Sequence, residues 1–137
     1  MQAKIIREMG LFDIFRPKWK HGNPDVRIAA AKELPDIGIL QKMATDDRDW
    51  FVRHRVFDEI RDRQPGDSVY AHLAKHSLDE EIRRKAVKKL KDEAVLEDVA
   101  SNDQFRYIRD AAAHRLDELR RNTYGEKSEP QSAKPAG

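Results

Sequence analysis

The chain has 137 residues and no cysteine, and charged residues make up 38% of it against 39% hydrophobic residues. This length predicts a single domain, and the formal net charge of +2 creates only a weak overall field. Disulfides and thiolate chemistry are excluded, and we expect a cytoplasmic protein. Because no run of about 18 apolar residues occurs and the first 20 residues carry charges throughout, we expect neither a membrane span nor a signal peptide.

Residues 1–22 are predicted to form a helical cap and a connector. The apolar side chains that fall near one face of a helix in this lead are Ile5, Ile6, Met9, Phe12 and Phe15. Trp19 follows in the connector. We expect Trp19 and the two phenylalanines to cover the open end of the helices that follow, and contact with a membrane or a partner is the alternative.

An apolar pattern then recurs four times between residues 23 and 121. Counted from Ile82, apolar residues stand at +4, +5, +8, +14, +17 and +18, with an acidic residue at +10. Val26, Val52 and Ile108 begin the other copies, and the four starting residues are spaced by 26, 30 and 26 residues. Four extra residues at 63–66 interrupt the second copy, and the last copy stops after +10.

The offsets 0, +4, +5 and +8 form one apolar stripe on a helix and do not alternate as a strand requires. The helices predicted to contain the stripe span residues 24–34, 48–63, 78–91 and 104–121, and shorter helices span 37–45, 67–76 and 93–101. The predicted helix starts are marked by Asn23-Pro24, by Asp36, by Asp92 and by the capping-box pair Ser77 and Glu80.

A period between 20 and 50 residues predicts stacked supersecondary units. We therefore predict an all-α fold, a right-handed α-α superhelix of about four helical-hairpin units over residues 23–121. Residues 122–137 have no apolar periodicity and are predicted to be a disordered tail.

The copies begin with related short elements, which are Val26-Arg27…Ala30-Ala31, Val52-Arg53…Val56, Ile82-Arg83…Ala86 and Ile108-Arg109…Ala112-Ala113. On these elements, residues 23–119 resemble HEAT-like repeats, the short variety known from phycobilin lyases. The resemblance implies a scaffold that binds other macromolecules, with the arginine-bearing helix on its concave face. The acid that the family places six residues before the arginine is matched by Asp47 and Asp103, but His21 and Ser77 occupy the other two places. We therefore expect an incomplete ladder of Asp–Arg contacts.

The arginine at +1 in each copy borders the apolar stripe. A side chain at this position can bury its stem while its guanidinium binds an acceptor. We predict a structural role for these repeated arginines, which are Arg27, Arg53, Arg83 and Arg109. The acids at +10 are further candidate partners, namely Asp36, Asp62, Asp92 and Glu118.

Few residues point to catalysis, a metal or a cofactor. His72 and His76 stand four apart, which would place both on one helix face as a metal pair requires. No third ligand is evident near them, so we expect solvated histidines. There is no Gly-rich phosphate loop and no serine or cysteine nucleophile motif, and we predict no catalytic residue, no metal and no cofactor.

The resemblance also includes enzymes of the lyase and DNA glycosylase types. Asp49, Trp50 and Phe51 could line the aromatic and acidic pocket of such an enzyme. However, Phe51 and Tyr107 share the offset −1, which favours packing between units instead.

Charge is segregated between the two kinds of predicted helix. The segments with the repeated arginine total +5, and the shorter helices total −6. The basic residues that we expect to bind a partner are Arg55, Arg84, Lys85, Lys88, Lys89 and Arg115. A salt-bridged, solvated face is the alternative.

We therefore predict a monomeric scaffold without enzyme activity that binds a protein partner along its concave face. Nucleic-acid binding through phosphate contacts is one alternative. A HEAT-like enzyme of the lyase or glycosylase type is the other.

Overall fold

The computed structural model describes residues 16–128, and this part of the chain contains seven α-helices, one short 3₁₀-helix and no strand. The prediction of an all-α fold is confirmed. The helices are η1 (Lys18–Lys20), α3 (Pro24–Glu33), α4 (Ile37–Asp46), α5 (Trp50–Asp62), α6 (Asp67–His76), α7 (Glu80–Lys89), α8 (Glu93–Asn102) and α9 (Arg106–Ser128).

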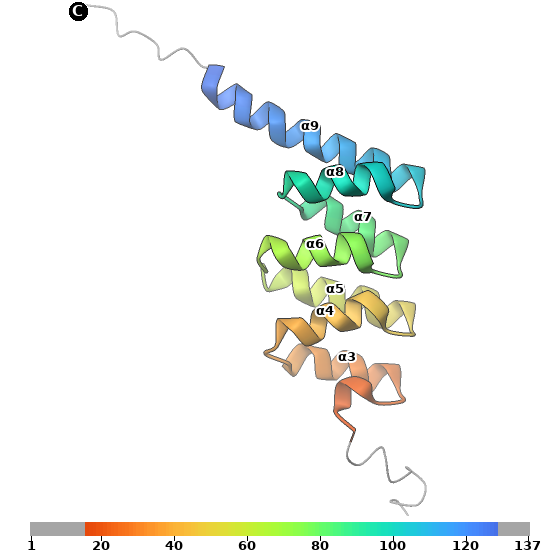
Figure 1. Cartoon of the computed structure of the whole chain (residues 1–137). Coiled ribbons are helices and arrows are strands. Elements are labelled where there is room, and N and C mark those ends of the chain that lie inside the picture. Colours follow the sequence, from red (N-terminus) through yellow and green to blue (C-terminus); the bar gives the residue numbers. More distant parts are fainter. Residues whose placement is uncertain (1–15, 129–137) are drawn as a thin grey trace, which may run out of the picture.

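The α-helices stack in two layers (Figure 1). Helices α3, α5, α7 and α9 pack side by side in one layer, and α4, α6 and α8 pack in the other. Among consecutive helices, the closest neighbours are α4 with α5, α6 with α7 and α8 with α9. This arrangement is compatible with a helical repeat. We call α3, α5, α7 and α9, each of which contains one repeated arginine, the arginine-bearing helices.

The two kinds of helix differ less in length than the sequence predicts. Helices α3 and α7 have ten residues each, as do α4, α6 and α8. Helix α7 starts late because Asp79 is its N-cap and accepts hydrogen bonds from the N–H groups of Glu81 at 3.0 Å and Ile82 at 3.4 Å. The predicted capping box is therefore wrong. Ser77 is the C-cap residue of α6, and its hydroxyl donates to the carbonyl of Ala44 at 3.1 Å.

The other predicted helix caps are confirmed. Asn23 accepts a hydrogen bond from the N–H of Asp25, in front of the first helical residue Pro24. Asp36 and Asp92 cap α4 and α8 in the same manner. These side chains satisfy amide groups that have no partner within the helix, so the helix starts follow directly from the local sequence.

The core follows the predicted stripe except at the two ends of the stack. The stripe residues of the second and third copies are all buried, namely Val52, Val56, Phe57, Ile60, Ile82, Ala86, Val87 and Leu90. In the first copy the residues at 0, +4 and +8, which are Val26, Ala30 and the α3 C-cap residue Leu34, are only half-buried, and in α9 Ala113 at +5 is exposed. The row 0, +4, +8 therefore faces the preceding unit and the +5 residue faces the following one. Each end unit lacks one of these neighbours within the described part of the chain.

The C-terminal end of the stack differs from the sequence prediction, whereas Trp19 packs at the N-terminal end as expected. Trp19 packs against the core and η1 contacts α3, while the predicted helical lead at residues 1–15 lies outside the described residues. Helix α9 continues to Ser128, although the sequence predicts its end at Arg121 and a disordered tail beyond. Once a helix is nucleated, each added residue gains a backbone hydrogen bond. Residues 122–128 therefore need no apolar stripe to extend it.

Candidate functional site

Three of the four repeated arginines bind an acid of the next unit. The pairs are Arg27–Asp47, Arg53–Asp79 and Arg83–Asp103, with N–O distances of 3.0, 3.3 and 2.9 Å. The sequence predicts an incomplete ladder, because Ser77 stands where an acid is expected. That expectation is wrong for this step, since Asp79, two residues later, supplies the carboxylate.

Each repeated arginine also donates from Nη1 to a backbone carbonyl six residues earlier. The acceptors are the carbonyls of His21, Asp47, Ser77 and Asp103, at 2.8, 2.6, 2.9 and 2.6 Å. Because the acceptor is a backbone group, this contact does not depend on the side chain at that position. Arg109 has this carbonyl and that of Gln104 as acceptors but no acid, since no unit follows α9 in the described residues.

The acids at +10 do not bind the repeated arginines. Asp36 and Asp92 are used as helix caps. Asp62 pairs with Arg61 at 3.4 Å, and Glu118 pairs with neighbours on α9. The expectation that these acids are further partners is therefore wrong, and the carboxylates that serve are all in the turns before α5, α7 and α9.

Of the six basic residues expected to bind a partner, three make contacts within the protein. Arg84 donates to Glu81 of the same helix at 3.0 and 3.1 Å. Arg115 donates from Nε to the carbonyl of Leu90 at 2.9 Å, which satisfies the C-terminal end of α7. The Lys85 ammonium lies 3.3 Å from Nδ1 of His54 on α5. These three side chains are less available to a partner than the sequence suggests.

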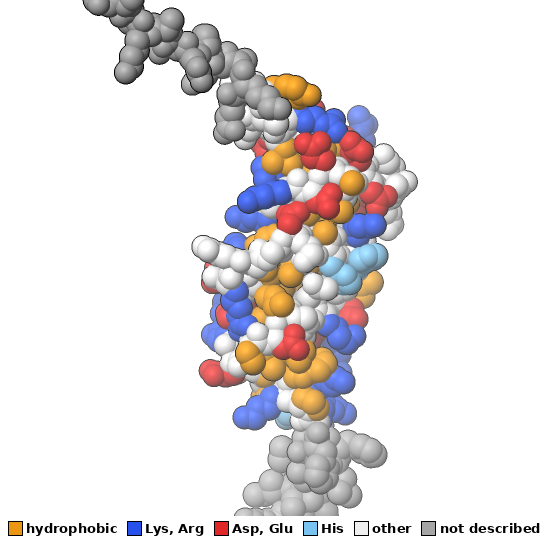
Figure 2. Space-filling model, turned by 60° about the vertical axis from the view of Figure 1, so that its left-hand side comes forward, with side chains coloured by type: hydrophobic (Ala, Val, Ile, Leu, Met, Phe, Trp, Pro, Cys, Tyr) orange, Lys and Arg blue, Asp and Glu red, His pale blue; other side chains and the backbone are white. Residues whose placement is uncertain are grey.

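The other three basic residues, Arg55, Lys88 and Lys89, are exposed. The Arg55 guanidinium lies 6.0 Å from the centroid of the Phe51 ring. On the face shown in Figure 2, blue and red side chains are interspersed, with hydrophobic side chains between them. This face therefore has no continuous basic surface.

The acidic charge of α8 is also compensated by neighbouring helices. Lys75 of α6 pairs with Asp98 at 2.9 Å, and Arg120 of α9 pairs with Glu93 at 3.3 Å and Glu97 at 2.6 Å. The hydrogen bond from Lys75 lowers the pKa of Asp98, and the hydrogen bonds to Glu97 and Glu93 raise the pKa of Arg120. Many of the charges that the sequence assigns to separate kinds of helix are therefore neutralised by ion pairs between neighbouring helices.

Large apolar side chains are exposed along the edge where α5, α7 and α9 begin, on the right in Figure 1. Trp50 is 64% exposed, Phe51 45%, Leu78 73% and Tyr107 40%. We call these four residues, three of which are aromatic, the aromatic edge. Phe51 and Tyr107 are thus only partly covered, and Tyr107 alone has a described contact with a neighbouring unit. Partial burial and a hydrogen bond with Glu80 raise the pKa of Tyr107, so this contact joins the starts of α7 and α9.

A polar cluster lies beside Trp50. The Trp50 and His54 rings are 5.9 Å apart, His54 Nε2 lies 3.0 Å from Asp79, and His54 Nδ1 lies 3.3 Å from Lys85 Nζ. Because the lysine ammonium can only donate, a neutral His54 accepts at Nδ1 and donates from Nε2 to Asp79. Burial acts to raise the pKa of Asp79, but the positive charge that His54 has in its protonated form and the hydrogen bond from Arg53 hold the pKa below its usual value.

The residues considered for enzyme or metal chemistry have other environments. Asp49 caps α5, where it accepts from the N–H groups of Phe51 at 2.8 Å and Val52 at 3.3 Å. His72 and His76 have ring centroids 4.8 Å apart, and burial together with His76 lowers the pKa of His72. Within residues 16–128, no group of three or more histidine, aspartate or glutamate side chains could hold a metal ion.

The exposure of the aromatic edge was the main feature that sequence reasoning missed. Its signal is present in the offsets. Trp50 and Phe51 stand at −2 and −1, and Tyr107 at −1, all outside the apolar stripe. Large apolar residues outside a stripe have no core position to occupy, so they remain on the surface.

No known family model, curated protein or solved structure matches this chain. In the described part, none of the helices combines the length and the apolar character that crossing a membrane requires. Function must therefore be inferred from the contacts and the surface of residues 16–128.

Proposed function

We propose that this chain is a HEAT-like repeat protein, a right-handed superhelix that binds a protein partner and has no enzyme activity. The two-layered stack supports this proposal, as does the repeated contact of each arginine with the turn before its own helix. The residues that the four copies share hold the helices together. We therefore expect a partner to be recognised by residues that the copies do not share.

The observation on which the proposal rests is the exposed aromatic pair on the first turn of α5. The Trp50 and Phe51 rings are 5.7 Å apart, and the two residues are 64% and 45% exposed. Trp, Tyr and Arg are the residue types most enriched at the energetic centres of protein interfaces. Arg55 above the Phe51 ring and Tyr107 at the start of α9 add to this composition. We therefore place the docking surface on the aromatic edge.

The charges at this edge indicate the chemistry of the partner. Arg55 and Arg106 are exposed, and within residues 16–128 the one ion pair of Arg106 is a long contact of 3.8 Å with Asp110. A partner segment with apolar side chains and flanking carboxylates would cover the rings and pair with both guanidinium groups. Arg84, Lys85 and Arg115 have contacts inside the protein, so we assign them no direct part in docking.

Site-specific photo-crosslinking tests the proposal. A benzoylphenylalanine replaces Trp50 in the full chain, and the same group at Tyr124, which is exposed on α9 away from this edge, is the matched control. We expect a protein adduct from position 50 that is absent from position 124 and is suppressed by Phe51→Ser. Equal adducts from both positions, or none from position 50, would overturn the proposal.

Nucleic-acid binding is less well supported, because half of the predicted basic set has partners within the protein. Lys88 and Lys89 remain exposed, and their charge reversal provides the test. If the alternative held, affinity for DNA or RNA would fall steeply with salt and would be lost in Lys88→Glu/Lys89→Glu. We expect no detectable binding at low salt.

A further inference from the structure

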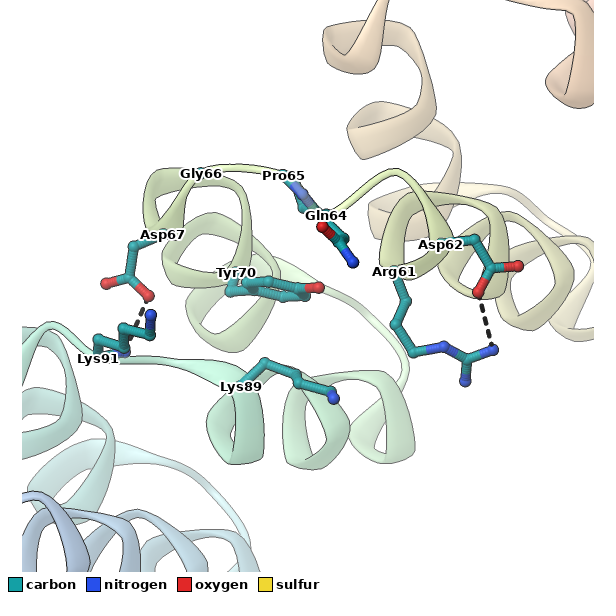
Figure 3. A pocket seen from close by; sticks show the side chains of 9 residues that line it. All are labelled: Arg61, Asp62, Gln64, Pro65, Gly66, Asp67, Tyr70, Lys89 and Lys91. Atoms are coloured by element: carbon teal, nitrogen blue, oxygen red, sulfur yellow. Dashed lines mark hydrogen bonds and ion pairs between the residues drawn. The ribbon is translucent and has the colours of Figure 1, made fainter.

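Three of the four extra residues of the second copy, Gln64, Pro65 and Gly66, line a cavity of about 750 Å³ between the α5–α6 turn and the start of the α7–α8 turn (Figure 3). Within this insertion Gln64 has a φ of 50°, the only positive value for a non-glycine residue in the described part of the chain. Such left-handed conformations are costly and are concentrated at functional sites. The insertion therefore merits a search for a ligand.

The insertion is anchored on both sides. Arg63 donates to the carbonyl groups of Leu34 and Ala31 at the end of α3. Asp67 accepts from the N–H groups of Lys91 and Asp92, each at 2.8 Å. These contacts fix the insertion against the units before and after it, so the cavity has a defined shape.

Cations outnumber the available acids in the cavity lining. Arg61, Lys89 and Lys91 line it together with Asp62 and Asp67. Asp62 pairs with Arg61 at 3.4 Å, and both oxygens of Asp67 are used by backbone N–H groups. The three cations and two carboxylates of the lining leave a net charge of +1, and neither lysine ammonium is engaged in an ion pair in the described part of the chain.

Tyr70 provides the second and independent observation. Its side chain is 8% exposed and packs against Phe57, but its hydroxyl has no hydrogen-bond partner among the described residues. Figure 3 shows this hydroxyl directed into the space beside Gln64 and Arg61, with Lys89 across from the ring. Burial raises the pKa of Tyr70, so the hydroxyl stays protonated and can donate. Among the described residues no fully buried side-chain polar atom lacks a partner, so the Tyr70 hydroxyl reaches the solvent of the cavity, where a ligand can accept its hydrogen bond.

We propose that this cavity binds a small organic phosphate monoester, with the phosphate held by Tyr70, Gln64 and Lys89. A phosphate monoester has a charge of about −1.5 to −2 at neutral pH and three strong acceptor oxygens, so it can accept hydrogen bonds from Tyr70, Gln64 and the two lysines at once, which a carboxylate with two oxygens does less well. Ligand cavities typically measure about 300–1,000 Å³, so the volume here leaves room for an organic group beyond the phosphate. The N-terminus of α6 at Gly66, which no side chain caps, adds a partial positive charge.

This site is separate from the docking surface. The turns that border the cavity lie at the edge of the stack opposite to the starts of α5, α7 and α9 (Figure 1). Loss of phosphate binding would leave the crosslinking result at Trp50 unchanged. The two proposals can therefore fail independently.

NMR titration of the full chain tests the site, with glucose 6-phosphate, AMP, inorganic phosphate and sulfate as probes at constant ionic strength. We expect one of the two phosphate esters to cause saturable amide shifts at residues 64–70 and 89–91, with a Kd of about 1 mM or tighter. Lys89→Gln and Tyr70→Phe should each weaken this binding by about tenfold. Lys88→Gln removes a neighbouring exposed charge outside the cavity lining and should leave the Kd unchanged.

Several results would overturn the proposal. These are the absence of saturable shifts with both esters, equal binding of sulfate and the esters, and an equal effect of Lys88→Gln and Lys89→Gln. The last two would indicate diffuse attraction of anions. Tyr70→Phe keeps the buried ring, and a melting curve verifies that it folds. If it does not fold, the comparison of the two exposed lysines decides the question.

Discussion

Replacing Arg27 by alanine tests the structural role of the repeated arginines. Arg27 is almost fully buried, and its Nε and Nη2 each donate to an Asp47 oxygen at 3.0 Å. Its Nη1 donates to the carbonyls of His21 at 2.8 Å and Gly22 at 3.1 Å. Because the Asp47 side chain is also buried, the substitution leaves a carboxylate without its counter-ion.

Removing one partner of a buried ion pair typically costs about 3–5 kcal/mol. Asp47 keeps a hydrogen bond from the N–H of Asp49 at 3.0 Å, so we expect Arg27→Ala to lower the free energy of unfolding by about 3 kcal/mol. Arg109 occupies the equivalent position but binds only backbone carbonyls. Arg109→Ala should therefore cost about 1 kcal/mol.

Urea unfolding followed by far-UV circular dichroism measures both values. With a urea m-value of about 1.5 kcal/mol/M, Arg27→Ala should lower the midpoint by about 2 M. Arg61→Ala, which removes only exposed ion pairs, is the control and should change the stability by less than about 0.5 kcal/mol. A cost for Arg27→Ala no larger than that for Arg109→Ala would refute the reasoning.

Three further predictions follow from single residues. The lowered pKa of Asp79 means that its contribution to stability is complete above the ordinary value of 3.8 and is lost as the pH falls through the lowered pKa. Melting temperatures measured at decreasing pH should show this loss of stability, and the loss should be smaller in Asp79→Asn. Gln64→Gly should raise the free energy of unfolding by about 1 kcal/mol in urea, because glycine adopts a positive φ without strain. Ile82→Ala should cost about 2–5 kcal/mol in the same assay, because Ile82 is fully buried between two neighbouring units, whereas Val26→Ala at the half-buried end should cost less.

The core of this fold could be predicted from offsets alone, because packing depends on a regular stripe. Residues such as Val56, Val87 and Leu90 are buried where the pattern placed them. The offsets did not reveal which neighbouring unit each stripe position packs against, because this depends on how the units are arranged in space. Val26, which is half-buried, and Ala113, which is exposed, show this at opposite ends of the stack.

Polar contacts were harder to predict, because they depend on where an atom lies rather than on a period. Asp79 takes the role of the acid expected in place of Ser77. It lies two residues later in the same turn, and its carboxylate still reaches Arg53. The long side chains of Lys85 and Arg115 reach acceptors on other helices, so their charge does not define an open basic surface. Sequence spacing predicts where a long charged side chain starts on its helix, but it does not predict which group the charged end of that side chain contacts.

The docking surface distinguishes this account from the simpler view of a basic concave face. Calorimetric titration with the partner obtained by crosslinking decides between them, with Trp50→Ser/Phe51→Ser compared against Lys88→Glu/Lys89→Glu. We predict that the aromatic substitutions weaken binding by about 30-fold or more, as expected for a hot spot worth about 2 kcal/mol, and that the charge reversals change it by less than about threefold. A large loss with the charge reversals and none with the aromatic substitutions would contradict the account.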